Sequence, residues 1–178
     1  MAPRMPFDYY HRLSRAQRAT YDRSDAITEV PLPSVDLLRP LVEQVVGALA
    51  ADQRREVERG LQALADALLD QLAVPRLLVK VKAVRPSAHW GELHGLYEVL
   101  EDGSEPRLTV WMRTVAHRRT VAPRTFVRTV VHELCHHLDG TLHGLAETFH
   151  TEGFFKRESS LVNQVLGPSS RGRKVRDS

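Results

Sequence analysis

The sequence lacks several features that would point to particular classes of protein. It contains a single cysteine, Cys135, which excludes an internal disulfide, and we expect this thiol to be inert packing in a cytoplasmic protein. No apolar run approaches the roughly 20 residues that span a bilayer. The N-terminal residues, among them Arg4 and Asp8, do not form the apolar stretch of about 7–15 residues that marks a signal peptide. We therefore expect no contact with a membrane.

The sequence also lacks a strong excess of either charge, because 25 Lys and Arg residues face 22 Asp and Glu residues. Residues 1–30 mix arginines with tyrosines, and residues 168–178 are basic and polar, so both ends could bind nucleic acid through phosphate contacts and base stacking. The simpler interpretation of the N-terminal part is a short helix that starts near Ser14 and keeps its arginines in water. The C-terminal residues have few apolar side chains, and we expect a disordered tail.

Hydrophobic periodicity divides the remaining chain into a helical part and a mixed core. Residues 1–75 contain the N-terminal arm and two amphipathic helices, one with a predicted N-cap at Ser34 and one from about Asp52. Residues 76–167 begin with segments of strand character, which are 77–84, 90–100 and 107–114. These strands predict a small mixed or antiparallel sheet, with 107–114 as its edge strand.

A His-Glu-x-x-His motif at residues 132–136 carries the most chemical information. It lies in a predicted helix over about 123–140, where positions four apart face the same way. His132 and His136 could therefore bind one zinc ion, which proteins hold through imidazole nitrogens at about 2.0–2.1 Å. Glu133 lies about 100° further round the helix and could take a proton from a water beside the metal.

A catalytic zinc needs a third protein ligand and one open position. His150 is the predicted third ligand, because it directly precedes a helix that would hold it firmly, and Glu147 is the rival. His137 falls on the apolar side of the motif helix and is expected in the core. His143 is one residue too late for the longer motif with a third histidine close behind. Asp139 shares the face of the ligands, and we expect it to accept the outer N–H of a ligand histidine.

The motif at 132–136, followed by His150-Thr151-Glu152-Gly153-Phe154, resembles the SprT-like zinc metallopeptidases over roughly residues 76–166. The chain differs from that family in having Thr-Glu-Gly where Gly-Pro is frequent, and in having no cysteine-rich zinc ribbon. The resemblance implies an α+β, zincin-like core, in which about three strands pack on the motif helix and a C-terminal helix. It implies zinc bound by His132, His136 and His150, with Glu133 as general base.

The sequence therefore predicts a zinc-dependent metallopeptidase that hydrolyses peptide bonds in a protein or peptide substrate. Three residues are candidates to stabilise the oxyanion, namely Tyr97, His143 and Arg157. The alternative is a zinc-containing module that binds nucleic acid or a partner without catalysis. The carboxylate of Glu133 favours the enzyme, because a purely structural pair of histidines has no need of it.

Overall fold

The computed structural model describes residues 7–84, 86–88, 91–92, 94–113 and 119–167. The elements follow in the order η1 (Asp8–Arg12), α1 (Arg15–Ala26), η2 (Val35–Leu37), α2 (Arg39–Ala50), α3 (Arg54–Gln71), β1 (Leu78–Val84), β2 (Ser87–Ala88), β3 (Gly91–Glu92), β4 (Gly95–Glu98), β5 (Arg107–Arg113), α4 (Pro123–Thr141) and α5 (Glu152–Leu166). This is an α+β fold, as predicted. Among the described residues, no helix combines the length and apolar character needed to cross a membrane.

The main sheet is mixed and has the order β1-β5-β4. Strand β5 runs parallel to β1 and antiparallel to β4, so the prediction of an edge strand at 107–114 is wrong. All five residues between Arg107 and Arg113 are buried, which fits a strand that has a neighbouring strand on each side. The segment predicted as one strand over 90–100 is divided, because β3 pairs with β2 while β4 pairs with β5.

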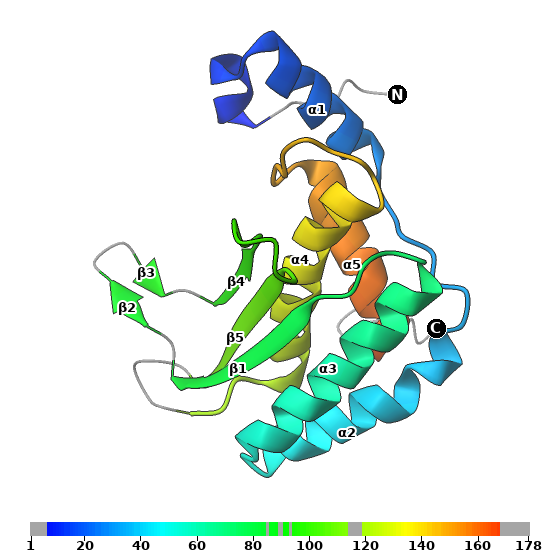
Figure 1. Ribbon diagram of the computed structural model, residues 1–178, viewed down its shortest axis with the longest axis vertical. Coiled ribbons are helices and arrows are strands. Elements are labelled where there is room, and N and C mark those ends of the chain that lie inside the picture. Colours follow the sequence, from blue (N-terminus) through cyan, green and yellow to red (C-terminus); the bar gives the residue numbers. More distant parts are fainter. Residues whose placement is uncertain (1–6, 85, 89–90, 93, 114–118, 168–178) are drawn as a thin grey trace, which may run out of the picture.

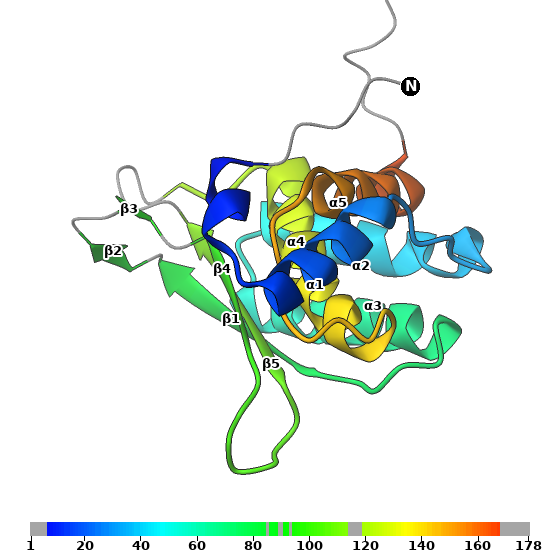
Figure 2. The ribbon, with the colours of Figure 1, turned by 90° about the horizontal axis from the view of Figure 1, so that it is seen from above.

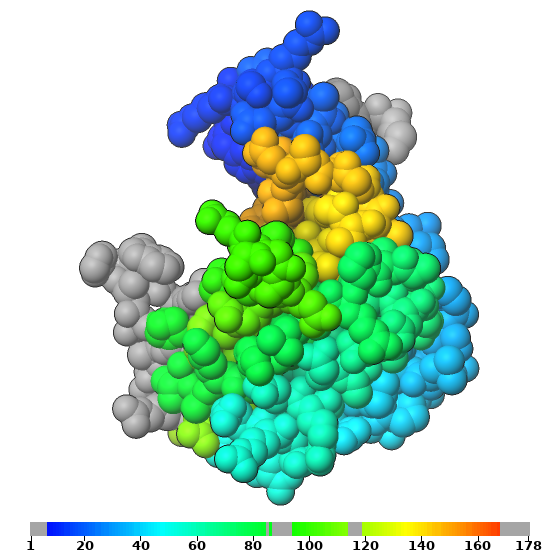
Figure 3. Space-filling view, in the orientation of Figure 1, coloured from blue at the N-terminus to red at the C-terminus, as the bar shows by residue number. Residues whose placement is uncertain are grey.

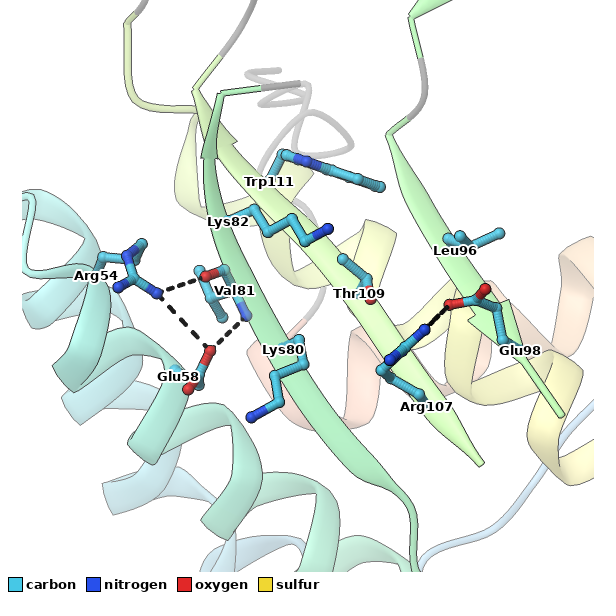
Figure 4. A pocket seen from close by; sticks show the side chains of 10 residues that line it. All are labelled: Arg54, Glu58, Lys80, Val81, Lys82, Leu96, Glu98, Arg107, Thr109 and Trp111. Carbon is cyan, nitrogen blue, oxygen red and sulfur yellow. Dashed lines mark hydrogen bonds and ion pairs between the residues drawn. The ribbon is translucent and has the colours of Figure 1, made fainter. Parts of the chain in front are cut away.

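The outer edge of β1 is blocked by side chains of α3. Backbone N–H groups of Val79 and Val81 donate to Gln62 (2.8 Å) and Glu58 (2.8 Å), and Arg54 donates to the Val81 carbonyl (2.9 Å; Figure 4). These bonds occupy groups that would otherwise pair with another strand. At the opposite edge, β4 packs against α4 and has no strand on its outer side within the described residues.

The four helices α2–α5 gather on one face of the sheet and leave the other face without a helix (Figures 1 and 2). Successive side chains of β5 point to opposite faces of the sheet, and only one of these faces is covered by helices. Its even-numbered side chains, Leu108, Val110 and Met112, join the hydrophobic core with the apolar stripes of the helices. Arg107 and Thr109 project from the opposite face (Figure 4).

The N-terminal helix forms as the sequence predicts, whereas the start of the next one differs. Ser14 caps α1, and its hydroxyl accepts from the Gln17 backbone N–H in a capping box. Ser34 makes no side-chain cap, because a short 3-10 turn follows it and α2 begins at Arg39. Pro40 explains the later start, since it has no N–H to satisfy and suits the first turn of a helix.

The C-terminal end of α1 docks on the N-terminal end of α5 at a glycine. The Gly153 N–H donates to Asp25 Oδ1 (2.9 Å), and the hydroxyls of Ser24 and Thr151 lie 3.4 Å apart. A Cβ atom at position 153 would lie 2.3 Å from the Asp25 carbonyl oxygen. Only glycine permits this approach of two backbones.

Replacing Gly153 with alanine should therefore separate α1 from α5. We expect Gly153→Ala to lower the free energy of unfolding by roughly 1–3 kcal/mol, the usual cost of forcing an atom into a packed contact. Gly47→Ala is the matched control, because a Cβ at position 47 meets nothing within 4 Å and alanine favours a helix interior. Denaturant titration of both variants measures the difference, and equal stabilities would contradict the docking contact.

Candidate metal centre

The structure brings His132, His136 and His150 together. The first two lie one turn apart on α4, and His150 lies in the loop that joins α4 to α5 (Figure 1). Their nearest ring nitrogens all lie within 4.8 Å of one another, and Nε2 of His136 is 3.2 Å from Nε2 of His150. Two nitrogens bound to one tetrahedral zinc ion are a little more than ~3 Å apart, so the spacing suits a shared metal.

Two of the three imidazoles are held by hydrogen bonds at their outer nitrogens. His132 Nδ1 donates to Glu158 Oε2 (2.8 Å), and the other oxygen of this carboxylate accepts from Arg128. His136 Nδ1 donates to the Thr148 hydroxyl (2.8 Å), which itself donates to Asp139 Oδ2 (2.7 Å). A proton on Nδ1 leaves the Nε2 lone pair free to bind a metal.

Asp139 bonds to a candidate ligand histidine only indirectly. The Thr148 hydroxyl lies between the carboxylate and His136, and Glu158 is the carboxylate that accepts directly from a candidate ligand, His132. The second oxygen of Asp139 accepts from Arg157 (2.7 Å), and both side chains are 1% exposed. This pair fixes Asp139 and, through Thr148, the orientation of His136.

The aromatic ring of Phe154 is an apolar neighbour of all three histidines. Its ring centroid lies 5.0 Å from each of the three imidazole centroids, and its side chain is fully buried. The central carbon of the Arg157 guanidinium lies 5.1 Å from the same Phe154 ring centroid. Phe154 therefore packs against all three imidazoles and also makes a cation–π contact.

Burial favours the neutral form of two of these imidazoles, those of His136 and His150. Burial, with smaller contributions from the charges of His132, His150 and Arg157, lowers the pKa of His136 to about 3. Burial also lowers the pKa of His150. Burial raises the pKa of Glu158, but the hydrogen bonds from His132 and Arg128 outweigh it, so the net shift is downward. Neutral imidazoles beside an ionised carboxylate form a donor set suited to zinc.

Glu133 faces strand β4 and borders a surface cavity of about 390 Å³ that His132 also lines. Burial raises the pKa of the Glu133 carboxyl, and the His132 charge and the Tyr97 backbone N–H offset part of this rise. A Cβ at Gly95 would lie 2.5 Å from Glu133 Oε1, so glycine is required for this approach. A raised pKa suits a carboxylate that must accept and return a proton.

The other sequence candidates lie outside the cluster of histidines. His137 is a core residue, as predicted: its Nε2–H donates to the Pro75 carbonyl (2.7 Å), and its Nδ1 accepts from the Tyr97 hydroxyl (3.0 Å). Glu147, the rival third ligand, accepts instead from Gln17 of α1 (3.1 Å). His143 is absent from the group of metal-binding side chains found among the described residues.

Arg157 is not available to stabilise an oxyanion. Its side chain is buried, and it donates to the backbone carbonyls of Ser24 (2.8 Å) and Ile27 (3.0 Å) as well as to Asp139. Arg157 is therefore excluded from the three candidates for this role, because its side chain is fully buried and both of its terminal NH2 groups are bonded inside the protein.

Sequence reasoning missed Glu158, Thr148 and the role of Gly95. The sequence does contain one indication of the role of Glu158. Arg157 and Glu158 share the buried face of α5 with Phe154 and Leu161, and charged residues in an apolar stripe imply buried partners. No local pattern distinguishes Thr148 or Gly95, because their partners lie on other elements.

Comparisons with protein-family models, curated proteins and solved structures find no match for this chain. The likeness to SprT-like metallopeptidases therefore depends on the motif residues alone.

Removing the carboxylate of Asp139 should strongly destabilise the fold. Asp139→Ala leaves the Arg157 guanidinium buried without a counter-charge, and breaking a buried pair in this way costs roughly 3–5 kcal/mol. Adding Arg157→Met removes the orphaned charge and should restore part of the loss. Denaturant unfolding of the metal-free single and double variants measures both effects.

Asp70→Ala provides the control for that experiment. Asp70 pairs with Arg76 in an exposed ion pair (2.6 Å), where water screens both charges. Its removal should have a much smaller effect than the removal of Asp139. Similar losses in both variants would show that burial of the Arg157 pair does not matter.

Proposed function

We propose that the protein is a zinc-dependent peptidase of the SprT-like, zincin type. The observation that carries the proposal is the convergence of three imidazoles, one of which, that of His132, borders an accessible cavity together with Glu133. Among the described residues, the group of potential metal ligands contains three members. Structural zinc sites normally have four protein ligands, whereas catalytic sites have three and keep one position open.

The residues present match the requirements of zinc in two respects. The donors are imidazole nitrogens, and the outer nitrogens of His132 and His136 are oriented by Glu158 and Thr148. When bound, zinc would lower the pKa of a water toward ~7 and polarise the scissile carbonyl. The protein supplies the geometry for this chemistry through a rigid helix, α4, and the docked start of α5.

Glu133 is the proposed general base. Its side chain is 7% exposed, and it shares the cavity with His132, so it can accept a proton from a water in that cavity. The same carboxyl can then return the proton to the amine that leaves. The raised pKa of Glu133 supports both steps, because a more basic carboxylate accepts the proton more readily.

Strand β4 is the proposed peptide-binding edge. It lies next to Glu133 at Gly95, and within the described residues no strand covers its outer side. An extended peptide can add to such an edge through main-chain hydrogen bonds, which require no particular sequence. The blocked outer edge of β1 cannot serve in the same way.

The alternative function is a binding module in which zinc only stabilises the fold. The predicted nucleic-acid contacts involve the termini, and residues 168–178 lie outside the described residues. A module without catalysis would bind zinc and show no hydrolysis that depends on Glu133.

Glu133→Gln separates the two functions. The variant should keep its zinc, because Glu133 is outside the ligand group, and should lose peptide hydrolysis by about 10²–10⁴-fold through loss of the base. Elemental analysis and a casein or self-cleavage assay, each with and without single-stranded DNA, provide the measurements. Wild-type rates in the variant would refute the role of Glu133.

His150→Ala tests the third ligand. The variant should lose stable zinc binding, because two imidazoles provide fewer ligands than a catalytic site uses. Glu147→Ala is the matched control in the same loop and should keep its zinc, since Glu147 bonds to Gln17. Zinc retained by the first variant and lost by the second would make Glu147 the ligand.

A further inference from the structure

Two phenylalanine side chains remain exposed beside the histidines. Phe155 is 41% exposed, and its ring centroid lies 5.7 Å from that of His150 and 6.4 Å from that of His132. Phe7 is 43% exposed and lies edge-on to Phe155, at a centroid distance of 6.5 Å. We call Phe7 and Phe155 the aromatic shelf.

Neighbouring structure holds each ring of the shelf in place: contacts with tyrosines hold Phe7, and helix α5 holds Phe155. The Phe7 N–H donates to the Tyr21 hydroxyl (3.2 Å), and the ring of Phe7 stacks against Tyr9. The Tyr9 hydroxyl donates to the His150 carbonyl (3.3 Å), which ties the N-terminal segment to the loop that carries the third histidine. Phe155 is fixed by its place on α5 next to the buried Phe154. Both rings are therefore positioned by ordered structure.

Burial of the two exposed rings of the shelf against a ligand would be favourable. Burying a phenylalanine side chain is worth roughly 1.5–3 kcal/mol, so two adjacent exposed rings leave apolar surface available for a ligand. Single exposed apolar side chains are ordinary, but here two aromatic rings adjoin one polar site. Binding sites commonly combine such apolar walls with a few polar groups.

The cavity that Glu133 and His132 border is lined by other side chains than those of the shelf. They include Thr125, Thr129 and Arg128, together with His94. Arg128 is paired with Glu158, so its charge is largely compensated. In the space-filling view, the blue N-terminal segment lies across a notch from the green chain around β4 (Figure 3). Neither Phe7 nor Phe155 lines this cavity, so the aromatic shelf is a separate surface beside the histidines.

We propose that the aromatic shelf is a specificity subsite that binds a large aromatic side chain of the peptide next to the scissile bond. This inference rests on the proposed peptidase function and adds a substrate class to it. Edge-to-face and offset contacts with Phe7 and Phe155 would favour an aromatic ring over a small side chain. The N-terminal segment would thereby select the substrate.

Binding of two zinc-chelating hydroxamates to the zinc-loaded, full-length protein tests the subsite without requiring hydrolysis. One compound carries a benzyl side chain next to the chelating group, and the other carries a methyl group there. Calorimetry should show tighter binding of the benzyl compound. Phe155→Ala and Phe7→Ala should each weaken it by roughly 3- to 10-fold, the effect of losing one aromatic contact, and leave the methyl compound unchanged.

Leu37→Ala is the control, because Leu37 is also exposed (67%) but belongs to η2, away from the centre. It should change neither affinity. Equal affinities of the two compounds for the wild-type protein, or equal losses for both compounds in the phenylalanine variants, would overturn the subsite. A protein that prefers the benzyl compound but does not cleave peptides would keep the subsite and refute the peptidase function.

Discussion

The buried ion pair between Arg157 and Asp139 connects the parts of the molecule on which the metal centre depends. Arg157 belongs to α5, Asp139 to the last turns of α4, and the carbonyls of Ser24 and Ile27 at the end of α1 accept from the other terminal NH2 group of the guanidinium. A buried charge is costly unless it is paired and hydrogen-bonded, so three helix ends must meet in one arrangement to bind the two terminal NH2 groups of Arg157. That arrangement sets the position of Thr148 through Asp139, and Thr148 in turn orients His136.

The parts of the fold that follow local rules could be predicted from the sequence. The helix that begins near Ser14 and the helix that follows His150 both form where the sequence predicts them, and Thr151 caps the second. Strand order could not be predicted, because it depends on partners far apart in the chain. The sequence predicts an edge strand at 107–114, yet β5 lies between β1 and β4, and Thr109 is buried on the face that no helix covers.

The candidate metal centre likewise has residues that could be predicted from the sequence and residues that could not. Spacing along one helix is enough to bring His132 and His136 to a common face, and the helix after Thr151 identifies His150 as a firmly held residue. The groups that orient these histidines come from other elements, so the sequence suggested Asp139 as a direct partner and gave no indication of Thr148. The equal distances from Phe154 to the three imidazoles likewise arise only when α5 packs beside α4.

The N-terminal segment is coupled to the centre although more than a hundred residues separate them in the chain. Tyr9 bonds to the backbone of His150, Gln17 to Glu147, and Arg23 to the carbonyl of His143 (3.1 Å), so α1 and the turn before it hold the loop between α4 and α5 at three points. The ring of Phe149 also packs against Tyr9 and Tyr21, so aromatic contacts add to these hydrogen bonds. Ordering of the third imidazole therefore depends on docking of α1, and a change in this segment would alter the centre without touching any of its ligands.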